Sequence, residues 1–170
     1  LDIGCSVGYT LVAARSLGLE PTGSDLSRYA IETCRQQGFR AEAGELSKLP
    51  FVDGEFGLVT MKHVLEHTPD PRAALREVKR VLRPGGRFMV VEPWRTPFLC
   101  FVHWVGSFRA ARRAWPKLDA LETMTELEWT TYDQWLRQPD AVLRTLETGF
   151  QVERKFIGWG KLMWLGRRSD

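Results

Sequence analysis

Cysteine is scarce in this sequence, and long apolar runs are missing from it. The 170 residues contain three cysteines, Cys5, Cys34 and Cys100, with no C-x-x-C pair and no regular spacing. Isolated thiols of this kind are typical of a reducing compartment, so we expect a cytoplasmic protein without a disulfide framework. No uncharged apolar stretch approaches the roughly 20 residues that span a bilayer, and no internal repeat or low-complexity tract is present.

An excess of charge of one sign is also lacking. The chain has 24 basic and 21 acidic residues, and the net charge of +3 is too small to indicate nucleic-acid binding by itself. The 44% hydrophobic and 26% charged composition is that of an ordinary globular protein. A length of 170 residues suits a single domain with a sizeable core.

Little sequence precedes the first glycine turn. Only Leu1, Asp2 and Ile3 come before Gly4, whereas a strand is usually about 5–6 residues long. We therefore expect the chain to begin inside its first strand, with its N-terminus truncated, so that targeting signals cannot be judged.

Strand-like and helix-like patterns alternate through the first two-thirds of the chain. This alternation predicts an α/β fold, a doubly wound and mostly parallel sheet with helices on both faces. Glycines follow two of the expected helices and should end them. Strands are expected at 22–26, 40–43, 56–64 and 87–93, helices at 11–17, 29–37 and 71–82, and a turn at 83–86.

The pattern changes after Trp94. The stretch 95–127 is rich in aromatic residues and follows no strand–helix alternation. A helix is then expected near 132–147 and strands near 150–157 and 161–165. Because only "GWG" separates these two strands, they should pair antiparallel and give the sheet an antiparallel C-terminal strand.

The opening "LDIGCSVGYT" contains a turn that lets a ligand approach the backbone closely. In doubly wound sheets, ligands bind at the carboxyl ends of the strands. A dinucleotide site requires G-x-G-x-x-G, but Tyr9 occupies the third position, where a small residue allows close helix–strand packing. Asp2 would repel a pyrophosphate and suits an ammonium or a sulfonium. The turn therefore disfavours a dinucleotide.

Five motifs, in order and at suitable spacing, carry a resemblance to a known family. They are "LDIGCSVG", "GSDLSRYAIETC", "GELSKLPFVDGEFGLV", "VLEHTPDP" and "LRPGGRF". The chain resembles the class I S-adenosylmethionine-dependent methyltransferases, in the branch of ubiquinone-, menaquinone-type and small-molecule enzymes. The resemblance covers 1–94 and extends loosely over 130–154.

The resemblance implies a Rossmann-like fold, S-adenosylmethionine as cofactor, and methyl transfer to a small organic or lipid-like acceptor. It implies a single domain with a cofactor-binding half at 1–94, a variable substrate or lid insert at 95–130, and a C-terminal helix and strand pair at 131–170. Asp25, about 20 residues after the turn, can accept both ribose hydroxyl protons, as acids at this position do in nucleotide-binding folds.

The family's remaining contacts are carried over residue by residue. The resemblance places Glu45 at the adenine amino group, the Leu46 backbone at the ring edge, and Lys62–His63, through the Lys62 backbone alone, beside the methionine moiety. The expected cofactor-binding residues are Asp2, Gly4, Cys5, Ser6, Gly8, Asp25, Leu26, Glu45, Leu46, Lys62 and His63. Asp2 and Asp25 could instead be strand-end or helix-capping acids, and simple turn filling fits the Cys5 and Ser6 side chains. No metal site is expected.

Three positions depart from the family pattern. Ser6 and Gly57 stand where the family usually has glycine and aspartate, and Glu45 replaces the commoner aspartate. Ser6 and Gly57 keep open an alternative function, a non-catalytic cofactor-binding or regulatory subunit with the same fold. A nicotinamide oxidoreductase is a second alternative, which Tyr9 opposes.

The catalytic residues are left unknown. His63 and His67 follow the fourth strand and are candidates for a general base, since imidazole suits proton transfer near neutral pH. They could equally cap or brace the segment before Pro69. His103, in the aromatic stretch, is unassigned.

The stretch Pro97–Trp115 has two features. Phe98, Phe101, Val102, Val105 and Phe108 recur at helical spacing, and Arg109, Arg112 and Arg113 follow them. Three interpretations fit: a lid packed on the sheet, the lining of a pocket for an aromatic or prenylated acceptor, and a peripheral contact with an anionic membrane surface. Contact with RNA ranks last because no RNA-binding module is recognisable.

Overall fold

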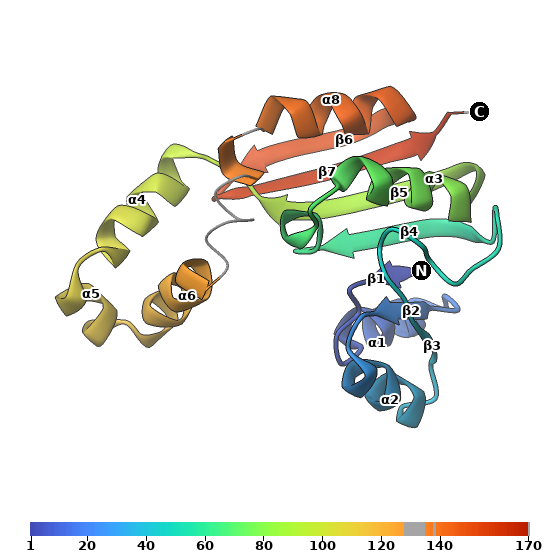
Figure 1. Ribbon diagram of the computed structural model, residues 1–170, viewed down its shortest axis with the longest axis horizontal. Helices are drawn as coiled ribbons and strands as arrows, with labels where there is room; N and C mark the ends of the chain where they lie inside the picture. Colours follow the sequence, from blue (N-terminus) through green and yellow to red (C-terminus); the bar gives the residue numbers. More distant parts are fainter. Residues whose placement is uncertain (128–134, 138, 170) are drawn as a thin grey trace.

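The computed structural model describes residues 1–127, 135–137 and 139–169 (Figure 1). Its strands form one sheet in the order β3-β2-β1-β4-β5-β7-β6. Neighbours from β3 to β5 pair in parallel, and β7 pairs antiparallel with both β5 and β6, as predicted. The strands are β1 (Asp2–Ile3), β2 (Thr22–Asp25), β3 (Arg40–Ala43), β4 (Phe56–Lys62), β5 (Leu82–Pro93), β6 (Phe150–Gly158) and β7 (Lys161–Arg168).

Helices cover both faces of this sheet, which confirms the doubly wound fold. Alternate side chains of a strand point to opposite faces. Ile3 lies in the large cluster beneath α3, whereas the neighbouring Gly23 faces Leu11 of α1. The helices are α1 (Tyr9–Ser16), α2 (Arg28–Gln36), α3 (Pro71–Val81), α4 (Pro97–Gly106), α5 (Arg109–Ala114), α6 (Pro116–Leu127) and α8 (Pro139–Gly149), with a 3-10 turn η1 (Leu65–His67).

Local sequence explains where several helices begin and end. The Ser27 hydroxyl accepts a hydrogen bond from the Ala30 N–H at the start of α2, and the Asp70 carboxylate accepts one from Ala73 at the start of α3. Gly18 and Gly38 follow α1 and α2 with φ of +76° and +75°, so both glycines end helices as predicted. Of the helix expected at 132–147, residues 139–147 lie in α8 and 135–137 are helical, while 132–134 and 138 lie outside the described residues.

The turn expected at 83–86 is an irregularity inside β5. Leu82 pairs with Phe56 and Arg87 pairs with Leu58, so the four residues between them stand opposite Gly57 alone. Pro84 has no N–H to donate and Gly85 has a φ of +69°, so regular pairing is interrupted there. The Arg83 guanidinium lies over Gly57, at the amino end of β4 and away from the carboxyl ends where a ligand is expected.

The connection between β6 and β7 is a two-residue turn. Trp159 and Gly160 have φ of +53° and +74°, and Gly158 pairs with Lys161. Two positive φ values at the centre of a hairpin fit the twist of the flanking strands. This turn brings Trp159 to the carboxyl end of β5, where the Trp94 N–H donates to the Gly160 carbonyl at 2.8 Å.

The expected helical spacing is confirmed for Phe98, Phe101, Val102 and Val105, which lie in α4, whereas Phe108 directly precedes α5. The stretch does not lie over a face of the sheet (Figure 1). Helices α4, α5 and α6 pack against one another and extend beyond the end of the sheet (Figure 1). His103 of α4 and Glu122 of α6 join the helices at 2.9 Å (Nδ1 to Oε1). Within α4 only Leu99 and Gly106 are buried, which leaves too little apolar contact to seat the segment on the sheet. Among the described residues, no helix has the length and apolar composition needed to cross a bilayer.

Candidate functional site

The glycine turn after β1 has a conformation that depends on its small residues. Gly4 has a φ of +72°, and a Cβ there would overlap the Val64 side chain on the loop after β4. Ser6 adopts a φ of +47°, which is uncommon for a residue with a side chain. Gly8, with a φ of +92°, precedes α1. The turn therefore lies directly against the loop that carries the candidate histidines.

Asp25, at the end of β2, is bonded to this turn. One carboxylate oxygen accepts from the Ser6 N–H at 2.9 Å, and the other accepts from the Ser27 N–H at 2.9 Å. Since an ionised carboxylate offers about four lone-pair positions, two stay available for a ligand. Asp25 is thus a strand-end acid that holds the glycine turn and the N-cap residue Ser27, and it can also accept hydroxyl protons.

The other predicted cofactor residues follow along the same edge. The Gly44 N–H donates to the Asp25 carbonyl at 3.2 Å, which places the exposed Glu45 and the half-buried Leu46 beside the end of β2. Leu26 and Lys62 are exposed at the ends of β2 and β4. We call the ends of β1 to β4, with the residues Gly4–Gly8, Asp25–Leu26, Glu45–Leu46 and Lys62–His63, the carboxyl edge.

Two predicted residues lie beneath this edge and not on it. Asp2 is 6% exposed, and its carboxylate accepts a hydrogen bond of 2.6 Å from the Thr60 hydroxyl. Burial raises its pKa. Cys5 is also buried, with its Sγ atom 4.0 Å from that of Cys34, and burial raises its thiol pKa. Both side chains support the turn from inside.

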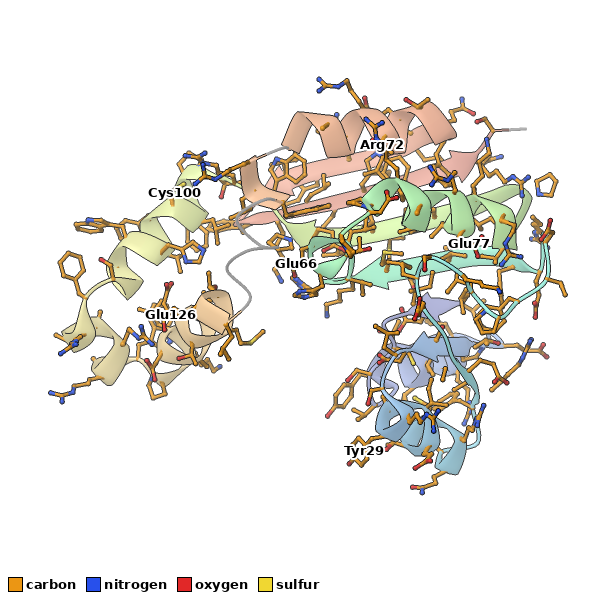
Figure 2. All side chains as sticks on the ribbon, in the orientation of Figure 1. Tyr29, Glu66, Arg72, Glu77, Cys100 and Glu126 are labelled. Atoms are coloured by element: carbon orange, nitrogen blue, oxygen red, sulfur yellow. The ribbon has the colours of Figure 1, made fainter. Side chains whose placement is uncertain are left out.

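A group of titratable side chains stands at the end of β4. The Glu66 carboxylate, on η1 (labelled in Figure 2), is buried. It lies 3.2 Å from His63 Nδ1 and 3.5 Å from His67 Nε2. His63 has a φ of +55°, a strained conformation that turns the chain at this point. His63 and His67 are therefore brought together by a carboxylate that the sequence analysis did not single out.

Glu92, near the end of β5, holds this loop from below. It is fully buried, and one oxygen accepts from the Val64 and Leu65 N–H groups at 3.1 Å each. Burial is the main cause that raises its pKa to about 8, so Glu92 is mostly protonated at neutral pH. His63, Glu66 and Glu92 offer three ligand atoms within 4.8 Å of one another, so they are the described residues that could hold a cation.

Next to this group is a cavity of about 380 Å³, which we call the apolar cavity. Its walls come from four separate parts of the chain: the loop after β4, the end of β5, helices α4 and α6, and the β6–β7 turn. A volume of this size can enclose a small organic molecule. The lining residues are His63, Glu66, His67, Pro93, Phe98, Leu99, Val102, Leu121, Met124, Thr125, Trp159, Gly160 and Lys161.

Sequence reasoning missed several residues of this region, and one signal could have revealed some of them. Glu92 is a single acid in an apolar strand, and such a residue usually has a specific partner when buried. Glu66 stands between the two histidines in "HVLEH". The residues of α6 and the β6–β7 turn carry no such signal, because their place in the cavity depends on tertiary packing.

The argument from Tyr9 against a dinucleotide is wrong. Tyr9 is 81% exposed, so its side chain does not occupy the space between helix and strand. The choice of ligand therefore depends on the acids, on the spacing of the motifs and on similarity to known proteins.

The sheet order and the glycine turn at its carboxyl edge define a Rossmann-like domain. A family model described as a methyltransferase domain matches residues 1–90. The chain therefore belongs to the methyltransferase domain family, which confirms the family predicted from the motifs.

Individual relatives agree with this assignment. A ubiquinone biosynthesis O-methyltransferase of Xanthomonas oryzae is 31% identical over 119 residues, covering 66% of this chain and 50% of that protein. A demethylmenaquinone methyltransferase of Staphylococcus aureus is 34% identical over 100 residues, covering 54% and 42%. The solved structure of an S-adenosylmethionine-dependent methyltransferase of Mesorhizobium loti matches with a TM-score of 0.63 and 17% identity, over 98% of this chain and 89% of that chain. The chain spans half or less of the length of these curated relatives.

Proposed function

We propose that this chain binds S-adenosylmethionine along the carboxyl edge and transfers its methyl group to a small, largely apolar acceptor in the apolar cavity. The observation that carries the proposal is that the two regions meet at His63, which belongs to both. In this assignment residues 1–94 form the cofactor-binding half, 95–130 contribute the acceptor side, and 131–170 complete the sheet.

The residues of the carboxyl edge fit this cofactor. Ser6 is exposed on the turn, and the Asp25 carboxylate keeps two acceptor positions for ribose hydroxyls. Glu45 and the Leu46 backbone would hold the adenine, and the Lys62 backbone and His63 would face the methionine part. Gly8 gives the turn its shape, Leu26 flanks the ribose, and Asp2 and Cys5 support the turn from below.

The residues around the apolar cavity would position the methyl acceptor and supply one basic group. When bound, the cofactor supplies an electrophilic methyl group on a positively charged sulfur. Such a transfer needs the acceptor held close and water excluded, which suits a cavity walled by Phe98, Val102 and Met124. With His63 Nδ1 hydrogen-bonded to Glu66, Nε2 can take the proton of an acceptor hydroxyl, and His67 is the second candidate.

Gly57 gives no reason to prefer a non-catalytic subunit. It lies under Arg83 at the amino end of β4, at the opposite end of that strand from the carboxyl edge. Ser6 keeps its N–H bonded to Asp25, and its side chain is exposed. A serine there is compatible with the turn conformation that the cofactor needs.

Ligand binding is the first test. Thermal unfolding and calorimetry would be measured with S-adenosylhomocysteine and, separately, with NAD. The proposal expects stabilisation by S-adenosylhomocysteine. Stabilisation by NAD alone would overturn it. Transfer of a labelled methyl group to phenolic and prenylated acceptors would then test the reaction, and cofactor binding with no methylated acceptor would favour the regulatory alternative.

The aromatic face of α4 and α5 is proposed to rest on an anionic membrane surface, at which a cytoplasmic protein would meet a lipid-like acceptor. Phe101, Trp104 and Phe108 are exposed and contact one another in series, with ring centroids 5.9 and 5.2 Å apart. Exposed Arg109 and Arg113 line a hollow next to this face. Aromatic side chains beside arginines are typical of interfacial helices.

Flotation with vesicles would test this contact. Vesicles containing phosphatidylglycerol should carry the protein upward, and phosphatidylcholine vesicles should carry much less. Substituting Phe101→Ser and Trp104→Ser should abolish flotation, whereas Tyr9→Ser and Tyr29→Ser, which remove two exposed aromatic residues elsewhere, should not. Equal flotation of both double variants would contradict the assignment.

A further inference from the structure

A groove between α3 and α8 collects positive charge away from the carboxyl edge. Its volume is about 500 Å³. Arg72, Arg76 and Lys79 line it from α3, and Arg144 lines it from α8. Figure 2 labels Arg72, which lies beside α8. The described residues that line this groove include no carboxylate, so four cations face one hollow.

These four cations face one hollow together and have no carboxylate partner among the described residues, whereas other basic side chains of the chain are held in ion pairs. Arg35, Arg40 and Lys155 each have a carboxylate partner within 2.5 to 3.1 Å. Arg80, Arg87, Arg112 and Arg167 are paired in the same way. Within the part of the chain that the structure describes, none of the four groove cations forms an ion pair. The groove therefore concentrates uncompensated charge on a chain whose net charge is only +3.

Helix geometry makes this arrangement costly without a ligand. Positions 72, 76 and 79 are related by four and three residues, so their side chains lie on one face of α3. Like charges at this spacing destabilise a helix by a few tenths of a kcal/mol per pair. An anion bound between α3 and α8 would remove this repulsion, and arginine is well suited to phosphate because its planar head donates two parallel hydrogen bonds.

We infer that the α3–α8 groove binds a small phosphorylated ligand carrying at least two phosphate groups. The row from 72 to 79 spans about 10 Å at the rise of an α-helix, which is longer than a single phosphate. Leu75 and Phe150 form the floor between the cations and leave an apolar surface for the rest of the ligand. The volume is that of a small-molecule site.

A nucleic acid fits the groove less well. Single strands are usually held by exposed aromatic rings that stack on successive bases. The one aromatic residue in the described lining, Phe150, is buried under the groove and packs against Phe88 and Trp164. The inference is independent of the proposed function, because no groove residue belongs to the carboxyl edge or to the apolar cavity.

Calorimetry with inorganic pyrophosphate, in low-salt buffer free of metal ions, would test the inference. The double variant Arg72→Gln/Arg144→Gln should bind pyrophosphate at least about tenfold more weakly than the unchanged protein. The matched control Lys117→Gln/Arg154→Gln removes the same charge from exposed positions outside the groove and should change the affinity less than about twofold. Pyrophosphate should also raise the thermal midpoint of the unchanged protein, and added salt should weaken binding.

Three results would overturn the inference. One is the absence of pyrophosphate binding at millimolar concentration. Another is an equal loss of pyrophosphate affinity in the groove variant and the control, which would show that the effect comes from net charge. The third is binding of a short single-stranded oligonucleotide that depends on Arg72 and Arg144 while pyrophosphate does not bind. Unligated thermal midpoints of the variants within about 2 °C of the unchanged protein would show that the fold is intact.

Discussion

The carboxyl edge and the apolar cavity adjoin each other but are built in different ways. The edge consists of backbone turns at strand ends, fixed by glycines at positive φ and by the Asp25 carboxylate that accepts two N–H groups. The cavity consists of side chains from four separate parts of the chain. A site shaped by the backbone keeps the same kind of ligand when side chains change. A cavity lined by side chains can accept a different ligand after a few substitutions. Substitutions in the two regions should therefore have separable effects.

Removing the Asp25 carboxylate should have the largest effect. Asp25→Ala deletes the group assigned to two ribose hydroxyls, and hydrogen bonds to a charged group contribute about 1.5–3 kcal/mol each. We expect S-adenosylhomocysteine to bind about 100-fold more weakly by calorimetry. Asp25→Asn, which keeps an acceptor for one backbone N–H, should lose less. Unchanged affinity for S-adenosylhomocysteine in the alanine variant would contradict the assignment of Asp25 to the ribose hydroxyls.

A methyl group at Gly4 should disturb the edge without touching the cavity. Gly4→Ala places a Cβ in the Val64 side chain at a φ of +72°, so we expect a loss of about 2–3 kcal/mol in the free energy of unfolding and weaker cofactor binding. Gly18→Ala is the control, because its φ is +76° but nothing lies within 4 Å of the new methyl group. It should cost about 1 kcal/mol and leave cofactor affinity unchanged. Equal effects of the two substitutions in urea unfolding would contradict this account of the turn.

Filling the cavity should separate acceptor binding from cofactor binding. Val102→Trp enlarges a side chain that lines the cavity, so KM for the acceptor identified by the activity screen should rise at least about tenfold. The affinity for S-adenosylhomocysteine should not change. Val105→Trp, on the same helix but outside the cavity lining, is the matched control. A parallel loss of cofactor affinity in Val102→Trp would show that the two regions are not separable.

Glu92 should affect the pH dependence of stability. The carboxyl ionises near its ordinary pKa of 4.5 in the unfolded chain and at about 8 in the folded protein. Between these values the folded state binds more protons, so the free energy of unfolding should fall as pH rises from about 5 to 8. Glu92→Gln keeps an oxygen for the Val64 and Leu65 N–H groups and should flatten this decline. Urea unfolding at three pH values measures this decline in both proteins. An equal decline in Glu92→Gln would contradict the raised pKa of Glu92.

Local sequence determined most of the strand and helix ends along the edge. The strand ends and the glycines that end α1 and α2 depend on interactions between residues close in sequence, so spacing was enough to predict them. The hydrogen bonds from the Ser6 and Ser27 N–H groups to Asp25 were not predicted. The irregularity at 83–86 was predicted as a turn because Pro84 and Gly85 are typical turn residues. Their local pattern cannot reveal that β5 pairs with β4 on both sides of them.

The acceptor side could be predicted only in part. Helical spacing identified α4, but its position beyond the sheet depends on contacts such as His103 to Glu122, which join residues distant in sequence. Glu66 and Glu92 come from different elements and meet only in the folded chain. The exposed Tyr9 shows that a motif position does not by itself fix where a side chain points.

A structure of the chain bound to S-adenosylhomocysteine tests the central claim most directly. The account predicts the ribose within hydrogen-bonding distance of the Asp25 carboxylate, the adenine beside Glu45 and Leu46, and the sulfur facing the apolar cavity at His63. A ligand bound elsewhere, or one whose sulfur faces away from that cavity, would contradict it.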